Sequence, residues 1–252
     1  MDTKELFPHE KSGTDTFGEA YASPEEMWRR ELHSKFIRDK ETWYHLGNSY
    51  WSSQESSLNG VLGGYEIINQ PDINTSREFV AFLKTSHAMA GRRALDCGCG
   101  IGRVTKFLLL NEFETVDLVD QCQKYVDHAR TFVDDSRAVN FYVQGLQNFN
   151  PEPRAYDCIW IQWVLAQLTD EDLVSFLRRI QNGLREGGII CIKENIKKNG
   201  FMVHKEDFSV TRSDKIYKIA FRNAGLRIIH EQLQPNFPED LYKVKMYACV
   251  PI

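Results

Sequence analysis

The sequence of 252 residues has no apolar run that approaches the roughly 20 residues needed to cross a bilayer. Its first 20 residues are polar and mixed in charge, and they lack the apolar centre of a signal peptide. The sequence therefore predicts no membrane partner. We expect a soluble protein of the cytoplasm, with the nucleus as a further location.

The sequence also lacks an excess of positive charge. Its 31 basic and 35 acidic residues are interspersed and give a net charge of -4. Binding to a phosphate backbone requires a cationic face, which this distribution does not provide. We therefore expect no nucleic acid partner.

The six cysteines include no CxxC pair. Cys97, Cys158 and Cys191 lie inside or at the end of apolar, strand-like runs, which favours reduced core thiols over disulfides. Cys97 and Cys99 would chelate a metal poorly beside glycines, and no histidine cluster accompanies them. The sequence predicts no metal site.

The most informative segment runs from Ala94 to Arg103 and is followed by a second strand-like run that ends on Asp120. It reads as a buried strand, three alternating glycines (Gly98, Gly100 and Gly102) and a helix. Glycines allow a sharp turn and a close approach to a ligand, while an acid at the tip of the next strand can accept both hydroxyls of a ribose. The pattern indicates a nucleoside site.

Position 103 distinguishes between nucleosides. A dinucleotide fingerprint would place its third glycine there, whereas this chain has Arg103. A guanidinium in the first helical turn can donate two parallel hydrogen bonds to a carboxylate. S-adenosylmethionine has a carboxylate and no pyrophosphate, so the pattern favours a class I methyltransferase. A nicotinamide enzyme and a chance glycine-rich turn remain the alternatives.

The rest of the chain predicts a single α/β domain over residues 49–252, preceded by an extension or helical cap over residues 1–48 with an amphipathic helix at 24–40. Residues 42–70 are rich in aromatics without regular periodicity and suggest a cover over a pocket. We predict strands at 93–97, 115–120, 140–143, 156–161, 189–194, 226–232 and 242–250. We predict helices at 76–86, 103–111, 121–134, 169–184 and 213–224. This alternation implies a Rossmann-like, seven-stranded, mainly parallel sheet with an antiparallel edge strand, as in class I methyltransferases.

Ligands of such sheets lie beyond the carboxyl ends of the strands. Strand ends therefore supply Gly98, Gly100, Gly102 and Arg103, with Asp120 for the ribose and Gln147 for the adenine. Trp160 is expected in the core, and Trp163 at the mouth of the crevice.

These residues converge on a family. The segments GVLGGY (60–65), LDCGCGIGR (95–103), WIQWV (160–164), KEN (193–195) and SVTRSD (209–214) together resemble the protein N-terminal methyltransferases that modify the α-amine of chains beginning Xaa-Pro-Lys. The resemblance implies that S-adenosylmethionine binds to Gly98, Gly102, Arg103, Asp120, Leu146, Gln147 and Gln162. It implies a peptide groove formed by Trp51, Leu62, Trp163, Asn195, Asp207 and Ser209.

The chain departs from this family at one position. Where the family usually has WIQWVxxHLTD, this sequence has Gln167 in place of the histidine. Glutamine can orient an amine but cannot take up its proton, which would leave Asp207 as the acceptor and Asn195 to hold the peptide. We therefore predict a methyltransferase with Asp207, Asn195 and Gln167 at its catalytic centre. A methyltransferase of small amines and a catalytically silent, cofactor-binding protein are the alternatives.

Overall fold

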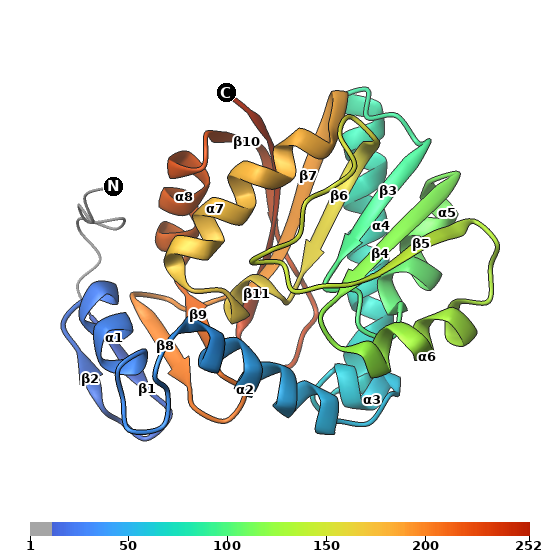
Figure 1. Cartoon of the computed structure of the whole chain (residues 1–252). Coiled ribbons are helices and arrows are strands. Elements are labelled where there is room, and N and C mark those ends of the chain that lie inside the picture. Colours follow the sequence, from blue (N-terminus) through green and yellow to red (C-terminus); the bar gives the residue numbers. More distant parts are fainter. Residues whose placement is uncertain (1–11) are drawn as a thin grey trace.

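A seven-stranded sheet forms the centre of the structure, a computed structural model that describes residues 12–252 (Figure 1). In spatial order its strands are β10 (Leu226–Leu233), β11 (Lys243–Pro251), β7 (Leu184–Ile196), β6 (Tyr156–Gln162), β3 (Arg93–Cys97), β4 (Thr115–Asp120) and β5 (Ala138–Val143). The strands from β5 to β7 are parallel, and β11 pairs antiparallel with both β7 and β10. The predicted fold class is confirmed, and the reversed strand is β11, next to the edge strand β10.

Helices cover both faces of this sheet. On one face lie α4 (Asn69–Ser86), a π-helical turn (Thr105–Leu109) that continues into α5 (Leu110–Glu112), and α6 (Gln123–Val133). On the other face lie α7 (Asp170–Ile180) and α8 (Asp214–Asn223), in front of the sheet in Figure 1. Because the chain builds β3, β4 and β5 in one direction and returns to add β6 and β7, a crevice is expected between the carboxyl ends of β3 and β6.

A second, four-stranded sheet lies beside the first. Its order is β2 (Ala20–Tyr21), β1 (Gly13–Asp15), β8 (Phe201–His204) and β9 (Ser209–Arg212). The sequence does not predict these strands, because runs of two to four residues are too short for a period to be recognised. The extension therefore contains strands as well as helices, and its first 11 residues lie outside the described part.

Three predictions for the N-terminal half were wrong. The helix predicted at 24–40 is α1 (Pro24–Glu31), and a separate helix, α2 (Lys40–Ser53), begins where Asp39 accepts a hydrogen bond from the Thr42 amide at 2.8 Å. Helix α2 and the short α3 (Leu58–Val61) occupy the stretch predicted to be irregular. Helix α4 begins at Asn69 rather than Ser76, because Pro71 and Asp72 both suit a first helical turn.

Three short 3-10 turns complete the described elements: Glu66–Ile68, Leu165–Gln167 and Gln181–Gly183. All six cysteines lie in the described part, and each is buried with a free thiol. Within residues 12–252 no helix is both long and apolar enough to span a membrane, and no three histidine, cysteine or acidic side chains are grouped as metal ligands.

Candidate active site

The glycine-rich turn after β3 needs all three of its glycines. Gly98, Gly100 and Gly102 have φ angles of +73°, +52° and +81°. Residues with a Cβ atom rarely adopt this left-handed region. A Cβ on Gly102 would lie 2.5 Å from Val133 of α6, so this glycine allows close packing behind the turn. Gly98 and Gly100 line the cavity beyond the turn, whereas Gly102, predicted to contact the cofactor, does not.

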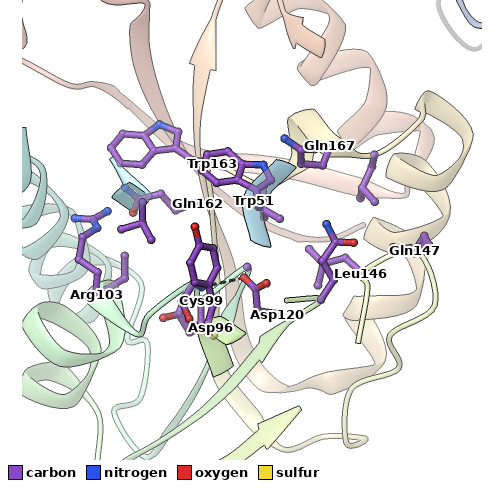
Figure 2. Close-up of a pocket in the computed structure, with 18 of the residues that line it drawn as sticks. Trp51, Asp96, Cys99, Arg103, Asp120, Leu146, Gln147, Gln162, Trp163 and Gln167 are labelled. Carbon is purple, nitrogen blue, oxygen red and sulfur yellow. Dashed lines mark hydrogen bonds between the residues drawn. The ribbon is translucent and has the colours of Figure 1, made fainter. Parts of the chain in front are cut away.

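This first cavity has a volume of about 960 Å³, part of it open to solvent. Figure 2 shows Arg103 at one end, Leu146 and Gln147 at the other, and Asp120 between them. Half-buried Asp120 accepts hydrogen bonds from the amides of Gly100 at 2.9 Å and Cys122 at 2.8 Å, and desolvation raises the pKa of its carboxyl. The order of cation, ribose-type acceptor and apolar wall fits the carboxylate, ribose and adenine of S-adenosylmethionine.

Arg103 is held by a buried charged cluster that sequence analysis missed. We call Asp72, Arg103, Gln162 and Lys193 the Asp72 cluster. The Asp72 carboxylate lies 2.7 Å from Arg103 Nη1 and 2.6 Å from Lys193 Nζ, and it accepts from Gln162 Nε2 at 2.9 Å. Burial alone would raise the pKa of Asp72, but Arg103 and Lys193 together hold it below its ordinary value.

The Asp72 cluster combines two cations with one anion, which suits a ligand carboxylate. Gln162 accepts from the indole of buried Trp160 at 2.9 Å, so its amide is used within the cluster. Gln162 lines the cavity as predicted, and its contacts make it a support for Arg103. The signal that could have located Asp72 is the Pro71–Asp72 pair, which marks the start of a helix.

The loop after β5 is held by a second arginine that sequence analysis missed. Arg179 of α7 donates to the carbonyls of Leu146, Gln147 and Phe149, each at 2.9 Å. Leu146 is buried and Gln147 is half-buried against the cavity. Arg179 thereby fixes the loop that we expect beside an adenine.

A second cavity adjoins the first, and we call it the acceptor groove. Its lining contains all the residues predicted for a peptide groove: Trp51, Leu62, Trp163, Asn195, Asp207 and Ser209. The two cavities share four lining residues, which are Trp51, Val61, Trp163 and Gln167. In Figure 2 the three labelled members of this set form the wall opposite Asp96 and Asp120. A ligand in one cavity can therefore contact a ligand in the other at this shared wall.

Gln167 connects three parts of this wall. With its amide oriented as the surrounding donors and acceptors require, its nitrogen donates to the backbone carbonyls of Asp207 and Phe208, and its oxygen accepts from Trp51 Nε1, all at 3.2 Å. These bonds occupy the amide and fix α2 to the turn between β8 and β9. Gln167, predicted as a catalytic residue, therefore lies at the wall that the two cavities share.

Acidic groups gather in the acceptor groove. Asp207 lies in the β8–β9 turn, where it accepts from the Ser209 hydroxyl at 2.8 Å, and burial raises the pKa of its carboxyl. Glu194, at the end of β7 beside Asn195, is buried and accepts from the amides of Val164 and Leu165; burial raises its pKa to about 7. These carboxyls make the groove suitable for a cationic ligand.

Trp163, in the shared wall, has an unusual backbone conformation. Its φ angle is +53°, a left-handed value that is costly for a bulky residue and that recurs at functional sites. The Arg103 guanidinium lies 5.4 Å from its ring centroid. Its indole nitrogen is buried and has no hydrogen-bond partner among the described residues.

The glycine turn, the ribose-type carboxylate and the adjoining groove define a class I S-adenosylmethionine-dependent methyltransferase. Solved structures agree with this class. A SAM-dependent methyltransferase from Leishmania major is 38% identical with a TM-score of 0.89, covering 95% of this chain and 96% of that one. The N-methyltransferase NodS from Bradyrhizobium japonicum shares the fold at 14% identity, with a TM-score of 0.56 over 71% of this chain and 95% of its own.

Sequence comparisons establish the family. The model described as AdoMet dependent proline di-methyltransferase matches residues 39–250, and the chain belongs to this family. Alpha N-terminal protein methyltransferase 1 from Arabidopsis thaliana is 42% identical over 94% of this chain and 90% of its own length. N-terminal Xaa-Pro-Lys N-methyltransferase 1 from Danio rerio is 44% identical over 84% of this chain and 97% of its own length. The nicotinamide enzyme and the chance glycine turn are thereby excluded.

Proposed function

We propose that this chain methylates the α-amino group of protein N-termini of the Xaa-Pro-Lys type. The observation that carries the proposal is the junction of the two cavities at Trp51, Trp163 and Gln167, with carboxyls on the acceptor side. The names of the relatives supply the type of N-terminus.

S-adenosylmethionine, when bound, supplies a methyl group on a sulfonium, and the acceptor must be a neutral amine with a free lone pair. An α-amine has a pKa of about 7.7 to 8.0, whereas a lysine amine has a pKa near 10.4. The α-amine is therefore partly neutral at physiological pH without assistance. This difference favours α-amines over lysine side chains in a site that works mainly by positioning.

The groove offers a contact for each part of such an N-terminus. Asp207, oriented by Ser209, would attract the ammonium. Asn195 would hold the peptide backbone, and the Trp163 ring would pack against the prolyl ring. The unpartnered indole nitrogen of Trp163 would find an acceptor in a peptide carbonyl. Trp51 and Leu62 would close the groove over the chain.

The two alternatives make different predictions. A small-amine methyltransferase would not need a groove that extends from Trp163 to Phe237 and Tyr242, as this one does. Activity on free amines without activity on a peptide would support it. The silent, cofactor-binding protein is suggested by Gln167 alone.

Mass spectrometry of a peptide beginning Ser-Pro-Lys tests the proposal. The peptide is incubated with the protein and S-adenosylmethionine beside the same peptide acetylated at its N-terminus. Methylation of the free peptide alone is expected. If neither peptide gains methyl groups while calorimetry shows cofactor binding, the protein has another acceptor or is silent.

A further inference from the structure

One histidine faces the acceptor groove. His204 is the last residue of β8 and pairs with Ser209, the first residue of β9. Partners in an antiparallel pair share one face of the hairpin, and His204, Ser209 and Thr211 all line the groove. The other face of the hairpin, including Val203 and Val210, is buried in the core. The imidazole therefore lies on the same wall as Ser209, whose hydroxyl binds Asp207.

The contacts of His204 are compatible with a tautomer whose Nδ1 can accept a proton. Its Nε2 lies 2.9 Å from the Thr211 hydroxyl, and its ring meets the Tyr242 ring edge-on with centroids 5.9 Å apart. When Nε2–H donates to Thr211 Oγ1, the lone pair of a neutral imidazole lies on Nδ1. This arrangement leaves Nδ1 as a proton acceptor.

The charges around His204 come from several elements. Burial, the larger effect, lowers the pKa of His204, while Asp207 and Glu206 on its own hairpin raise it. The charge of His204 in turn lowers the pKa of Asp207, which burial raises. Glu194 from β7 and the Tyr242 phenol line the groove from other sides. His204 and Asp207 thus form an interacting pair of titratable groups.

We propose that His204 is the proton acceptor of the acceptor groove, a part that Gln167 cannot play. This inference rests on the proposed function. The substrate binds as an ammonium attracted by Asp207, and one N–H bond breaks as its proton passes to His204 Nδ1. The freed lone pair then forms the N–C bond to the methyl group while the S–C bond breaks and its electron pair remains on sulfur.

The other groove residues are less suited to this part. The amide of Gln167 has no basic atom and is occupied by three hydrogen bonds. Oε1 of Glu194 accepts hydrogen bonds from the backbone amides of Val164 and Leu165. This buried carboxyl therefore holds the turn that contains these two residues. Of the described groove residues, His204 has the side chain whose ordinary pKa of about 6.5 lies nearest neutrality.

The pH dependence of His204→Asn distinguishes proton transfer from a structural role. Without a proton acceptor, the variant must use the neutral form of the peptide α-amine. This form is about 9–17% of the peptide at pH 7 and more than about 90% at pH 9. We expect kcat/KM for the Ser-Pro-Lys peptide to fall about six- to elevenfold at pH 7 and to stay within about 1.2-fold of wild type at pH 9.

Further variants and a binding measurement complete the experiment. Thr211→Val, which removes the hydroxyl that orients the ring, is expected to show a smaller loss with the same pH dependence. His45→Asn, at an exposed position on α2, is the matched control and should match wild type at both pH values. Calorimetry should show unchanged S-adenosylmethionine affinity in all three variants.

The outcomes separate this inference from the proposed function. An equal loss at pH 7 and pH 9, or no loss at either, overturns the role of His204 while leaving a wild-type enzyme that methylates the peptide. Failure of the wild type on the peptide at pH 9 overturns the proposed function and this inference with it.

Discussion

Replacement of Asp72 by asparagine tests whether the Asp72 cluster is a true buried charge network. Asp72 and Lys193 are fully buried, and Arg103 is 5% exposed. In the native protein, the carboxylate compensates both cations at once. In Asp72→Asn, Arg103 and Lys193 would remain buried close together with no anion between them.

Breaking a buried ion pair by removing one partner costs about 3–5 kcal/mol. Because two cations lose the same partner here, we expect the free energy of unfolding to fall by an amount near the upper end of this range. For a chain of this size, the corresponding fall in Tm is about 6–20 °C. Removing one stranded cation as well, in Asp72→Asn with Lys193→Met, should recover about 1–3 kcal/mol relative to the single variant.

Urea unfolding of the cofactor-free protein at pH 7.5 measures these free energies. Asp127→Asn, at an exposed position of α6, is the control and should stay within about 0.5 kcal/mol of wild type. The reasoning is refuted if Asp72→Asn lies within about 1 kcal/mol of wild type, or if adding Lys193→Met only increases its cost.

Four further predictions follow from the site. Glu194→Gln should stabilise the protein more at pH 8 than at pH 5 in urea unfolding. Burial raises the pKa of Glu194 from its ordinary 4.5 to about 7, so the stability that the neutral form contributes is lost as the pH rises between these two values; equal effects at both pH values would contradict this. Arg103→Met should weaken S-adenosylmethionine binding about 10- to 100-fold in calorimetry, and unchanged affinity would remove its assignment to the carboxylate. Asp207→Asn should lower kcat/KM for the peptide about 10- to 100-fold at unchanged cofactor affinity, a role that an unaffected rate would disprove. Gln167→His should not raise kcat, since an imidazole cannot replace three amide bonds; a large gain from near zero would indicate a degenerate site.

The central strands could be predicted because their signals are local. Residues 93–97 and 115–120 are apolar runs that end at a glycine and at an acid, and the observed β3 and β4 have the same bounds. The hairpin of β8 and β9 could not be predicted in this way. Each strand has four residues, and they become strands by pairing with each other and with β1.

The site residues likewise divide into those that local sequence locates and those that depend on contacts between distant segments. Residues at the ends of parallel strands meet at one edge of the sheet, so Asp120 and Trp163 were located from their positions in the sequence, whereas Asn195 was located from the family resemblance. Asp72 and His204 were not, because each reaches the site through packing between distant segments. Lys193 lies within the strand predicted at 189–194, but its burial against α4 and its charge partner depend on the folded structure.

The described residues before position 39, where the family match begins, support the acceptor groove although they do not line it. Strand β1 pairs in parallel with β8, and Lys205, beside His204, forms an ion pair with Glu31, which also accepts from the Tyr21 hydroxyl at 2.7 Å. On the other side of Asp207, the Phe208 ring packs edge-on against Trp43, which meets Trp28 of α1 in the same way. The turn that carries Asp207 is thus supported at both ends by contacts that lead to residues before position 39, where the family match begins. The geometry of the groove therefore depends in part on a segment that the family model does not include, and a protein without this segment must support its hairpin by other contacts.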